Sequence, residues 1–177
     1  MEDLFNWASE GKTGVVLHSI GNDHNLGAIA RTAAFFDVKY LVLNENDSSF
    51  DGDTRLTTSA YRVAEGGFEH ITVRKISNTA AFLKDAGKRL VTVGTDTKAR
   101  RRITDLKDII ESAHSGYTKI TSGKPGVALV LGNEETGLPK DVKEQCSCLL
   151  RIPGTGNIES LNVSQAAALF LHTIFQI

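Results

Sequence analysis

Two stretches near the carboxyl end of the chain decide its fold: LVLGNEETGLP, residues 129–139, and IPGTGNIESLNVSQAAA, residues 152–168. The first is a short apolar run followed directly by Gly-Asn-Glu, which predicts a buried strand that ends in a polar turn. The second is a glycine-rich loop that ends in Ser-Leu-Asn before an apolar helix. Together they bring polar groups to one sheet edge, where open α/β sheets bind ligands.

Outward from these stretches, short apolar runs alternate with helical patterns. This alternation, with short connections, predicts an α/β fold whose mostly parallel sheet carries helices on both faces. We expect one domain over residues 1–177, a length that suffices for a sizeable core. The expected strands cover residues 15–18, 40–43, 70–73, 90–93, 127–131 and 149–152, and the expected helices cover residues 25–36, 53–63, 78–84, 140–145 and 163–175.

The segment 95–126 is the least regular part of the chain, and we expect a long surface loop with one short helix at residues 106–112. It contains a basic cluster, Lys98, Arg100, Arg101 and Arg102, in a chain whose formal net charge is only −1. This cluster is the best local candidate for contact with nucleic-acid phosphates, and the alternative is a solvated loop.

Composition and missing motifs exclude several classes of protein. No apolar run approaches the roughly 20 residues of a membrane helix, and the polar N-terminus is unlike a secretory signal, so we expect a cytoplasmic protein. Cys146 and Cys148 are too close for an ordinary disulfide and have no second pair for zinc, so we expect reduced thiols and no metal site. The dinucleotide fingerprint GxGxxG, the P-loop and the GxSxG nucleophile elbow are missing.

A third polar motif, NDHNLGAIARTAAFF, opens an early helix at residues 22–36. Arg31, the only charge in its body, is either a solvated side chain or a guanidinium that faces a phosphate or a developing oxyanion. Glu134 is either a carboxylate at a helix N-terminus or a ligand contact. Ser160 and Asn162 both precede the last helix, and capping does not easily account for both.

The final helix, residues 163–175, is apolar nearly all round. Such a helix is buried on more than one side. We therefore expect it to form a homodimer interface, and the alternative is a helix wrapped by its own sheet.

Taken together, the three motifs resemble the SpoU (TrmH-like) family of RNA ribose 2′-O-methyltransferases, in the SPOUT superfamily. The family pattern has N-x-G-x-x-x-R early, a strand that ends in G-N/A-E-x-x-G late, and I-P-x-x-G followed by S-L-N-V-S at the last helix. The positions that match it, in order and spacing, are Asn25, Gly27 and Arg31, then Gly132, Asn133, Glu134 and Gly137, then Ile152, Pro153 and residues 160–164. The resemblance covers nearly the whole chain.

The resemblance implies a C-terminal trefoil knot that binds S-adenosylmethionine, and a homodimer that methylates transfer or ribosomal RNA. The residues expected to form the catalytic site are Asn25, Arg31, Glu134, Ser160 and Asn162, and Arg31 can reach the cofactor of the partner protomer. The residues expected to bind the cofactor are Leu131, Gly132, Asn133, Ile152, Pro153 and Leu161. The residues expected to bind RNA are Arg31, Lys98, Arg100, Arg101 and Arg102.

Three alternatives stay open at this point. One is a knotted protein that binds RNA or cofactor without turnover, and another is a SPOUT enzyme that methylates a base. The third is a flavodoxin-like domain for a small molecule or phosphate, which predicts a glycine-rich loop after the first strand, where only Gly21 and Gly27 occur. The chain is either a minimal member of the family or the catalytic part of a longer protein.

Overall fold

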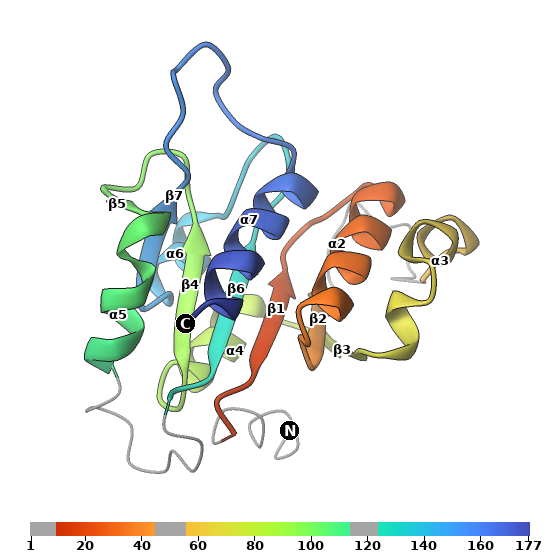
Figure 1. The fold of residues 1–177 in the computed structure, drawn as a ribbon, viewed down its shortest axis with the longest axis horizontal. Helices are drawn as coiled ribbons and strands as arrows, with labels where there is room; N and C mark the ends of the chain where they lie inside the picture. Colours follow the sequence, from red (N-terminus) through yellow and green to blue (C-terminus); the bar gives the residue numbers. More distant parts are fainter. Residues whose placement is uncertain (1–9, 45–55, 114–123) are drawn as a thin grey trace.

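The computed structural model describes residues 10–44, 56–113 and 124–177, and a seven-stranded sheet runs through their centre (Figure 1). The strand order is β3-β2-β1-β6-β4-β7-β5, and all the pairings between these strands are parallel. The expected parallel α/β sheet is therefore confirmed. The strands are β1 (Thr13–Leu17), β2 (Tyr40–Asn44), β3 (Thr72–Ile76), β4 (Val91–Thr95), β5 (Arg101–Arg102), β6 (Val127–Leu131) and β7 (Cys148–Arg151).

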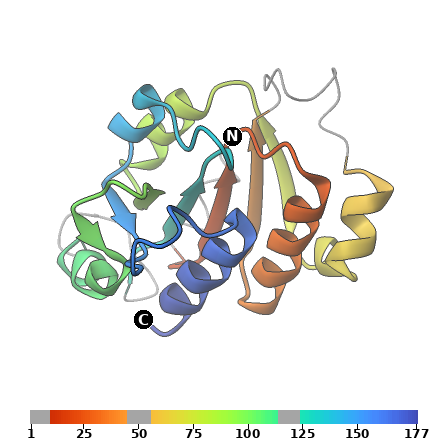
Figure 2. The ribbon, with the colours of Figure 1, turned by 90° about the horizontal axis from the view of Figure 1, so that it is seen from above.

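Helices cover both faces of the sheet, as the sequence predicts (Figure 2). One face carries α2 (Asp23–Phe35), α3 (Thr58–Ala64), α5 (Leu106–Ala113) and α7 (Val163–Phe175), and the other carries α4 (Thr79–Ala86) and α6 (Lys140–Glu144). Each face has its own hydrophobic core, in which large side chains such as Phe170 and Leu83 are almost completely buried. None of the helices in the described ranges is long and apolar enough to span a membrane.

Strand β6 is the central element of the sheet. All five of its residues, Val127–Leu131, are buried, and it pairs with β1 on one side and β4 on the other. Leu129, for example, lies beside Val15 of β1 and Val93 of β4. A strand that is buried on both faces needs apolar residues at every position. The sequence of β6, VALVL, has this pattern. The residues that follow β6 therefore emerge at the middle of the carboxyl edge of the sheet.

The expected elements are found with shifts of a few residues at their ends, except in the segment 95–126. There the helix expected at residues 106–112 is confirmed as α5, but the rest of the described segment is not simply a loop. Strand β5 pairs with β7, and the 3₁₀-helix η2 (Ile103–Asp105) follows it. Two adjacent arginines carry no apolar alternation, so the sequence pattern could not indicate a strand. Residues 53–55 of the helix expected at 53–63, and residues 114–123, lie outside the described residues.

Helices α2 and α3 approach each other closely at Gly27. A Cβ atom at this position would lie 2.5 Å from the carbonyl oxygen of Ala60 and 2.8 Å from Cβ of Val63. The α2–α3 contact thus depends on the missing side chain. Thr57 anchors the start of α3 by accepting a hydrogen bond from the backbone N–H of Ala60 and donating its hydroxyl to Asp23 at 2.8 Å.

We predict that Gly27→Ala lowers the free energy of unfolding by about 2 kcal/mol. Crowding against the backbone of α3 costs about 3 kcal/mol, and the better helix propensity of alanine returns about 1 kcal/mol. Urea denaturation measures the difference, with Gly21→Ala as the control, because nothing lies within 4 Å of a Cβ at position 21. A Gly27→Ala protein that unfolds at the wild-type urea concentration would contradict the close approach.

Candidate active site

The chain turns back sharply after β6, and Gly132 lies inside this turn. A Cβ atom at position 132 would lie 2.4 Å from the carbonyl carbon of Gly137 and 2.5 Å from the backbone nitrogen of Leu138. Asn133 and Gly137 form an antiparallel bridge, and Gly137 has a φ of 68°. No side chain fits at position 132, so the backbone itself forms this part of the sheet edge.

The side chain of Asn133 fixes the turn in place. Its Oδ1 accepts hydrogen bonds from the backbone N–H groups of Glu135 and Thr136, at 2.9 and 3.0 Å. Its Nδ2 donates to the carbonyl oxygen of Ser19 at 2.8 Å, just beyond the end of β1. Asn133 therefore connects the turn after β6 to the neighbouring strand.

A chain of side-chain hydrogen bonds connects the three polar motifs of the sequence. Asn25, in the first turn of α2, donates from Nδ2 to Oε1 of Glu134 at 2.7 Å. Its Oδ1 accepts from Nδ2 of Asn162 at 3.0 Å, and Asn162 caps α7 by accepting from the backbone N–H of Ser164 at 2.8 Å. Asn25 is buried. The partners of Asn25 lie 109 and 137 residues away in the sequence, so only the tertiary fold brings them together.

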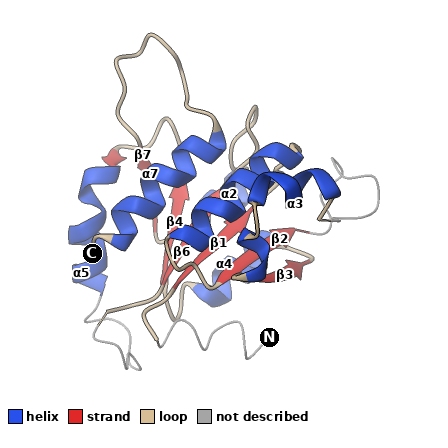
Figure 3. Ribbon diagram, turned by 45° about the vertical axis from the view of Figure 1, so that its right-hand side comes forward, coloured by secondary structure: helices blue, strands red, loops and turns tan. Residues whose placement is uncertain are grey.

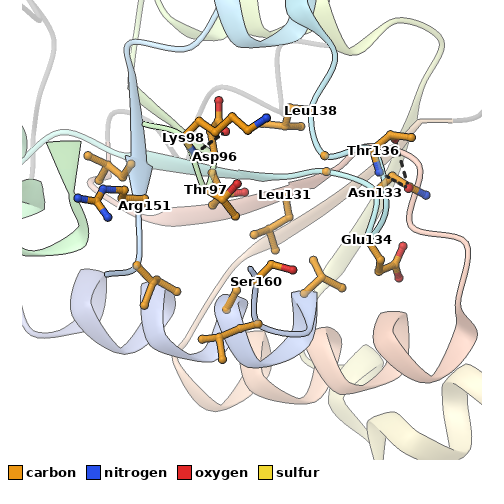
Figure 4. A pocket seen from close by; sticks show the side chains of 18 of the residues that line it. Asp96, Thr97, Lys98, Leu131, Asn133, Glu134, Thr136, Leu138, Arg151 and Ser160 are labelled. Atoms are coloured by element: carbon orange, nitrogen blue, oxygen red, sulfur yellow. Dashed lines mark hydrogen bonds between the residues drawn. The ribbon is translucent and has the colours of Figure 1, made fainter. Parts of the chain in front are cut away.

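A cleft of about 390 Å³ lies beside these groups at the carboxyl edge of the sheet (Figure 4). The loop between β7 and α7, which stands out from the body of the protein in Figure 3, contributes one part of its wall. The residues that line the cleft come from the ends of β4, β6 and β7 and from α6 and α7, and they include Thr95, Asp96, Thr97, Lys98, Leu131, Gly132, Asn133, Glu134, Lys143, Arg151, Ile152, Glu159, Ser160 and Leu161.

Most residues expected to bind a cofactor lie in this cleft. Leu131, Gly132, Asn133, Ile152 and Leu161 line it, whereas Pro153 does not. Two residues of the expected catalytic set, Glu134 and Ser160, also line the cleft, and Asn25 and Asn162 are joined to Glu134 by the hydrogen bonds described above.

Arg31 does not join this group within one chain. It lies on α2, where its Nη1 forms an ion pair with Oε1 of Glu65 at 2.8 Å, and both side chains are more than half exposed, at 58% and 61%. Six residues along the helix, at about 100° per residue, place Arg31 about 120° around the helix axis from Asn25. The two side chains therefore leave α2 in different directions, and Arg31 is not part of the cleft lining.

The basic cluster is divided in the same way. Lys98 lines the cleft, whereas Arg100, Arg101 and Arg102 do not. Arg101 and Arg102 form the edge strand β5 and are exposed. Only Lys98 of the four cationic residues is thus placed in the cleft lining.

On the side of the cleft that follows β4, sequence reasoning named Lys98 but missed Asp96 and its partner Lys143. Asp96 is only 15% exposed and forms an ion pair with Nζ of Lys143 at 2.9 Å, and its Oδ1 accepts from the backbone N–H of Lys98 at 3.0 Å. Burial raises the pKa of Asp96, but the hydrogen bonds from Lys143 and Lys98 outweigh it and hold the pKa below its ordinary value. The pair therefore stabilises the fold above the unfolded-state pKa of aspartate, and this contribution is lost as the pH falls through the lowered pKa. The only signal in the sequence was the position of Asp96 just after a predicted strand.

The cleft is polar and carries charges of both signs. The acidic residues in its lining are Asp96, Glu134, Glu135 and Glu159, and the basic residues are Lys98, Lys143 and Arg151. Such a lining suits a ligand that is itself polar and carries both charges.

Both cysteines are free thiols, as the sequence predicts. Burial raises the pKa of Cys146 to about 12 and that of Cys148 to about 11. Thiols with such pKa values stay protonated at neutral pH and are poor nucleophiles. In the described parts of the chain, no group of three or more histidine, cysteine or acidic side chains could hold a metal ion.

Comparison with known proteins identifies the family. The chain belongs to the SpoU rRNA Methylase family, whose model matches residues 12–172. It is 31% identical over 177 residues to the 23S rRNA (guanosine-2′-O-)-methyltransferase RlmB of Nitrosomonas europaea, covering 99% of this chain and 60% of that protein. It is 34% identical over 160 residues to an uncharacterized tRNA/rRNA methyltransferase of Borreliella burgdorferi, covering 90% of this chain and 62% of that protein. The chain thus spans about three fifths of the length of these curated relatives.

Solved structures share the fold. AviRb, a SpoU methyltransferase of Streptomyces viridochromogenes solved in complex with AdoMet, superposes with a TM-score of 0.72 at 21% identity, covering 94% of this chain and 58% of AviRb. A structure described as giving insights into the 2-OH methylation of C/U34 on tRNA superposes with a TM-score of 0.72 at 22% identity, covering 94% of this chain and 96% of the other. These likenesses support the α/β architecture seen here.

We predict that Asn25 and Glu134 are energetically coupled. Glu134→Ala should lower the free energy of unfolding by about 1–3 kcal/mol, because it leaves the buried amide of Asn25 without an acceptor. Asn25→Ala should lower it by about 1 kcal/mol, because the exposed partners Glu134 and Asn162 can bind water instead. The double variant should lose less than the sum by at least about 0.5 kcal/mol, measured by urea denaturation.

The control for this cycle combines Asn25→Ala with Asp85→Ala. Asp85 lies on α4, which covers the other face of the sheet. These two changes should be additive within about 0.5 kcal/mol. If the changes in the free energy of unfolding add equally well in both cycles, the result would argue against the hydrogen bond between Asn25 and Glu134.

Proposed function

We propose that this chain is an S-adenosylmethionine-dependent methyltransferase that transfers a methyl group to a ribose 2′-hydroxyl of transfer or ribosomal RNA. The observation that carries the proposal is the hydrogen-bonded chain of Glu134, Asn25 and Asn162 beside the cleft. The choice of ribose rather than base rests on the names of the similar proteins, which describe guanosine-2′-O and 2-OH methylation.

The residues of the cleft fit this cofactor. Its volume of about 390 Å³ is within the range of small-molecule sites. The side chains of Leu131, Ile152 and Leu161 offer apolar surface for an adenine ring, and the bare backbone at Gly132 permits close approach. The carboxylates of the cleft suit a cationic sulfonium. When bound, S-adenosylmethionine would supply a methyl group on that sulfonium.

The residues of the chain would orient the ribose hydroxyl. Glu134 has one carboxylate oxygen bonded to Asn25, which fixes the direction of the other oxygen beside the cleft. We assign to Glu134 and Ser160 the positioning of the hydroxyl, and to Asn25 and Asn162 the positioning of Glu134 and of the start of α7. Dipoles that are already fixed toward the hydroxyl need no reorganisation as charge develops on its oxygen.

Arg31 would clamp the phosphate next to the target ribose and stabilise the developing oxyanion. A guanidinium does not give up its proton at neutral pH, so Arg31 is a poor candidate for a general base. Its planar fork suits a phosphate, which it can bind through two hydrogen bonds. Because Arg31 does not line the cleft of its own chain and instead pairs with Glu65, we propose that it serves the cleft of a second copy.

An aromatic surface at the ends of α2 and α7 supports a homodimer. Phe36 packs against Phe35, His172 and Phe175 with ring centroids 5.0, 5.9 and 5.6 Å apart. Phe35 is 81% exposed and Phe175 is 56% exposed. Adjacent large apolar side chains in water mark an interaction surface, and we propose a second copy as its partner. Membership of the family also supports a trefoil knot in the C-terminal part.

We predict that the purified protein transfers labelled methyl groups from S-adenosylmethionine to unfractionated transfer RNA or ribosomal RNA. The product distinguishes ribose from base, because alkali cleaves RNA through the free 2′-hydroxyl. A 2′-O-methylated ribose therefore leaves an alkali-resistant dinucleotide that carries the label. Label found only in mononucleotides after alkali would indicate base methylation and contradict the proposal.

The matched variant for this assay is Arg31→Lys. It keeps the positive charge but replaces a two-pronged donor with a single point charge, so the rate should fall at least about tenfold. Calorimetric titration with S-adenosylhomocysteine serves as the control, because the proposed clamp acts on the RNA phosphate and should leave the affinity for this cofactor product unchanged. Near-normal turnover by Arg31→Lys would contradict the clamp.

A further inference from the structure

We propose that Arg102 and Arg151 together bind one phosphate of the RNA backbone at the rim of the cleft, and that Arg101 does not. This inference rests on the proposed function and identifies where the RNA enters. The sequence predicted a phosphate contact for the whole cluster around Arg102 without Arg151. The structure separates its members and adds a residue from another strand.

The register of the sheet edge brings the two arginines together. Strands β5 and β7 run parallel, and Arg102 lies directly beside Arg151. Side chains of paired residues on neighbouring strands point to the same face, so these two guanidinium groups share one face of the sheet.

The same register sends Arg101 to the opposite face. It lies beside Leu150, whose side chain belongs to the hydrophobic core under α5 and α7. Successive residues of a strand alternate between faces, so Arg101 shares the side of Leu150 and Cys148 rather than that of Arg151. The electrostatic interaction between Arg101 and Cys148 agrees with this assignment.

The charges of Arg102 and Arg151 are not neutralised by an ion pair with any acidic side chain in the parts of the chain that the structure describes. Asp105 accepts a hydrogen bond from the backbone N–H of Arg102 at 2.8 Å, and this contact leaves the guanidinium available. Two like charges side by side on neighbouring strands repel each other. An anion between them would relieve the repulsion, and a phosphate matches two guanidinium forks.

The location of the pair indicates which anion it binds. Arg151 lines the cleft at the end away from Glu134, and Figure 4 shows its side chain directed outward. Lys98 also lines the cleft. Each ribose in RNA lies between two phosphates, so an RNA that delivers a 2′-hydroxyl to the cleft necessarily brings phosphates to its rim. Arg102 and Arg151 stand where such a phosphate would arrive.

The test compares Arg102→Ala and Arg151→Ala with Arg101→Ala, which removes the same charge one residue away. Binding of fluorescein-labelled unfractionated transfer RNA is measured by anisotropy at several salt concentrations. The first two variants should each weaken binding about three- to tenfold at low salt. Each should also reduce the slope of log K against log salt by about 0.7–0.9, the value for one phosphate contact. Arg101→Ala should behave as wild type.

The double variant Arg102→Ala/Arg151→Ala tests whether the two arginines bind the same phosphate. If both residues hold one phosphate, the double variant should bind only slightly more weakly than either single variant. Urea denaturation of every variant shows whether the fold is intact.

The remaining outcomes separate this inference from the proposed function. Equal losses in all three single variants would show a general effect of surface charge and overturn the inference. Unchanged binding in Arg102→Ala and Arg151→Ala, with normal methyl transfer, would overturn the inference alone. A wild-type protein that neither binds nor methylates RNA would overturn the proposed function, and the inference with it.

Discussion

The two hydrogen bonds of the Asn25 side chain are the interaction on which the candidate site depends. An amide side chain can donate one hydrogen bond and accept another at the same time. Asn25 donates a hydrogen bond to Glu134 and accepts one from Asn162. A carboxylate at this position could not donate, and an apolar side chain could do neither. Because the residue is buried, water is not a ready substitute for either partner. The first turn of α2, the turn after β6 and the start of α7 are thereby held at fixed relative positions.

The order of strands makes this meeting possible. Strand β6 lies next to β1, although more than a hundred residues separate them in the chain. The turn after β6 therefore emerges beside the segment that leads from β1 into α2. Asn133 strengthens the connection through its hydrogen bond to the carbonyl of Ser19. Strands β4 and β7 complete the edge and contribute the remaining wall of the cleft.

The sequence predicted the parts of this arrangement that local patterns encode. The buried run 127–131, the polar turn after it and the capped start of α7 each have a local signature, and the structure contains all of them. The resemblance to a family then grouped three motifs that periodicity could not connect. The structure brings Asn25, Glu134 and Asn162 into contact, although their roles in catalysis remain a proposal.

The sequence could not predict features that arise only from tertiary contacts. The pairing of Asp96 with Lys143 joins two segments that carry no shared pattern. Strand β5 exists because β7 lies beside it, so two arginines become an edge strand without any preference of their own. The direction of Arg31 depends on which side of α2 faces α3, and the ion pair with Glu65 becomes apparent only after folding.

The central claim is that a cleft of one protomer is completed by Arg31 of a second copy. Co-expression of differently tagged Arg31→Ala and Glu134→Ala chains, followed by tandem purification of the mixed dimer, tests it directly. If Arg31 acts across the dimer, one site of the mixed dimer combines an intact cleft with an intact Arg31. Methyl transfer to RNA should then recover to about half of the wild-type rate, although each parent is inactive. A mixed dimer no more active than its parents would contradict the account.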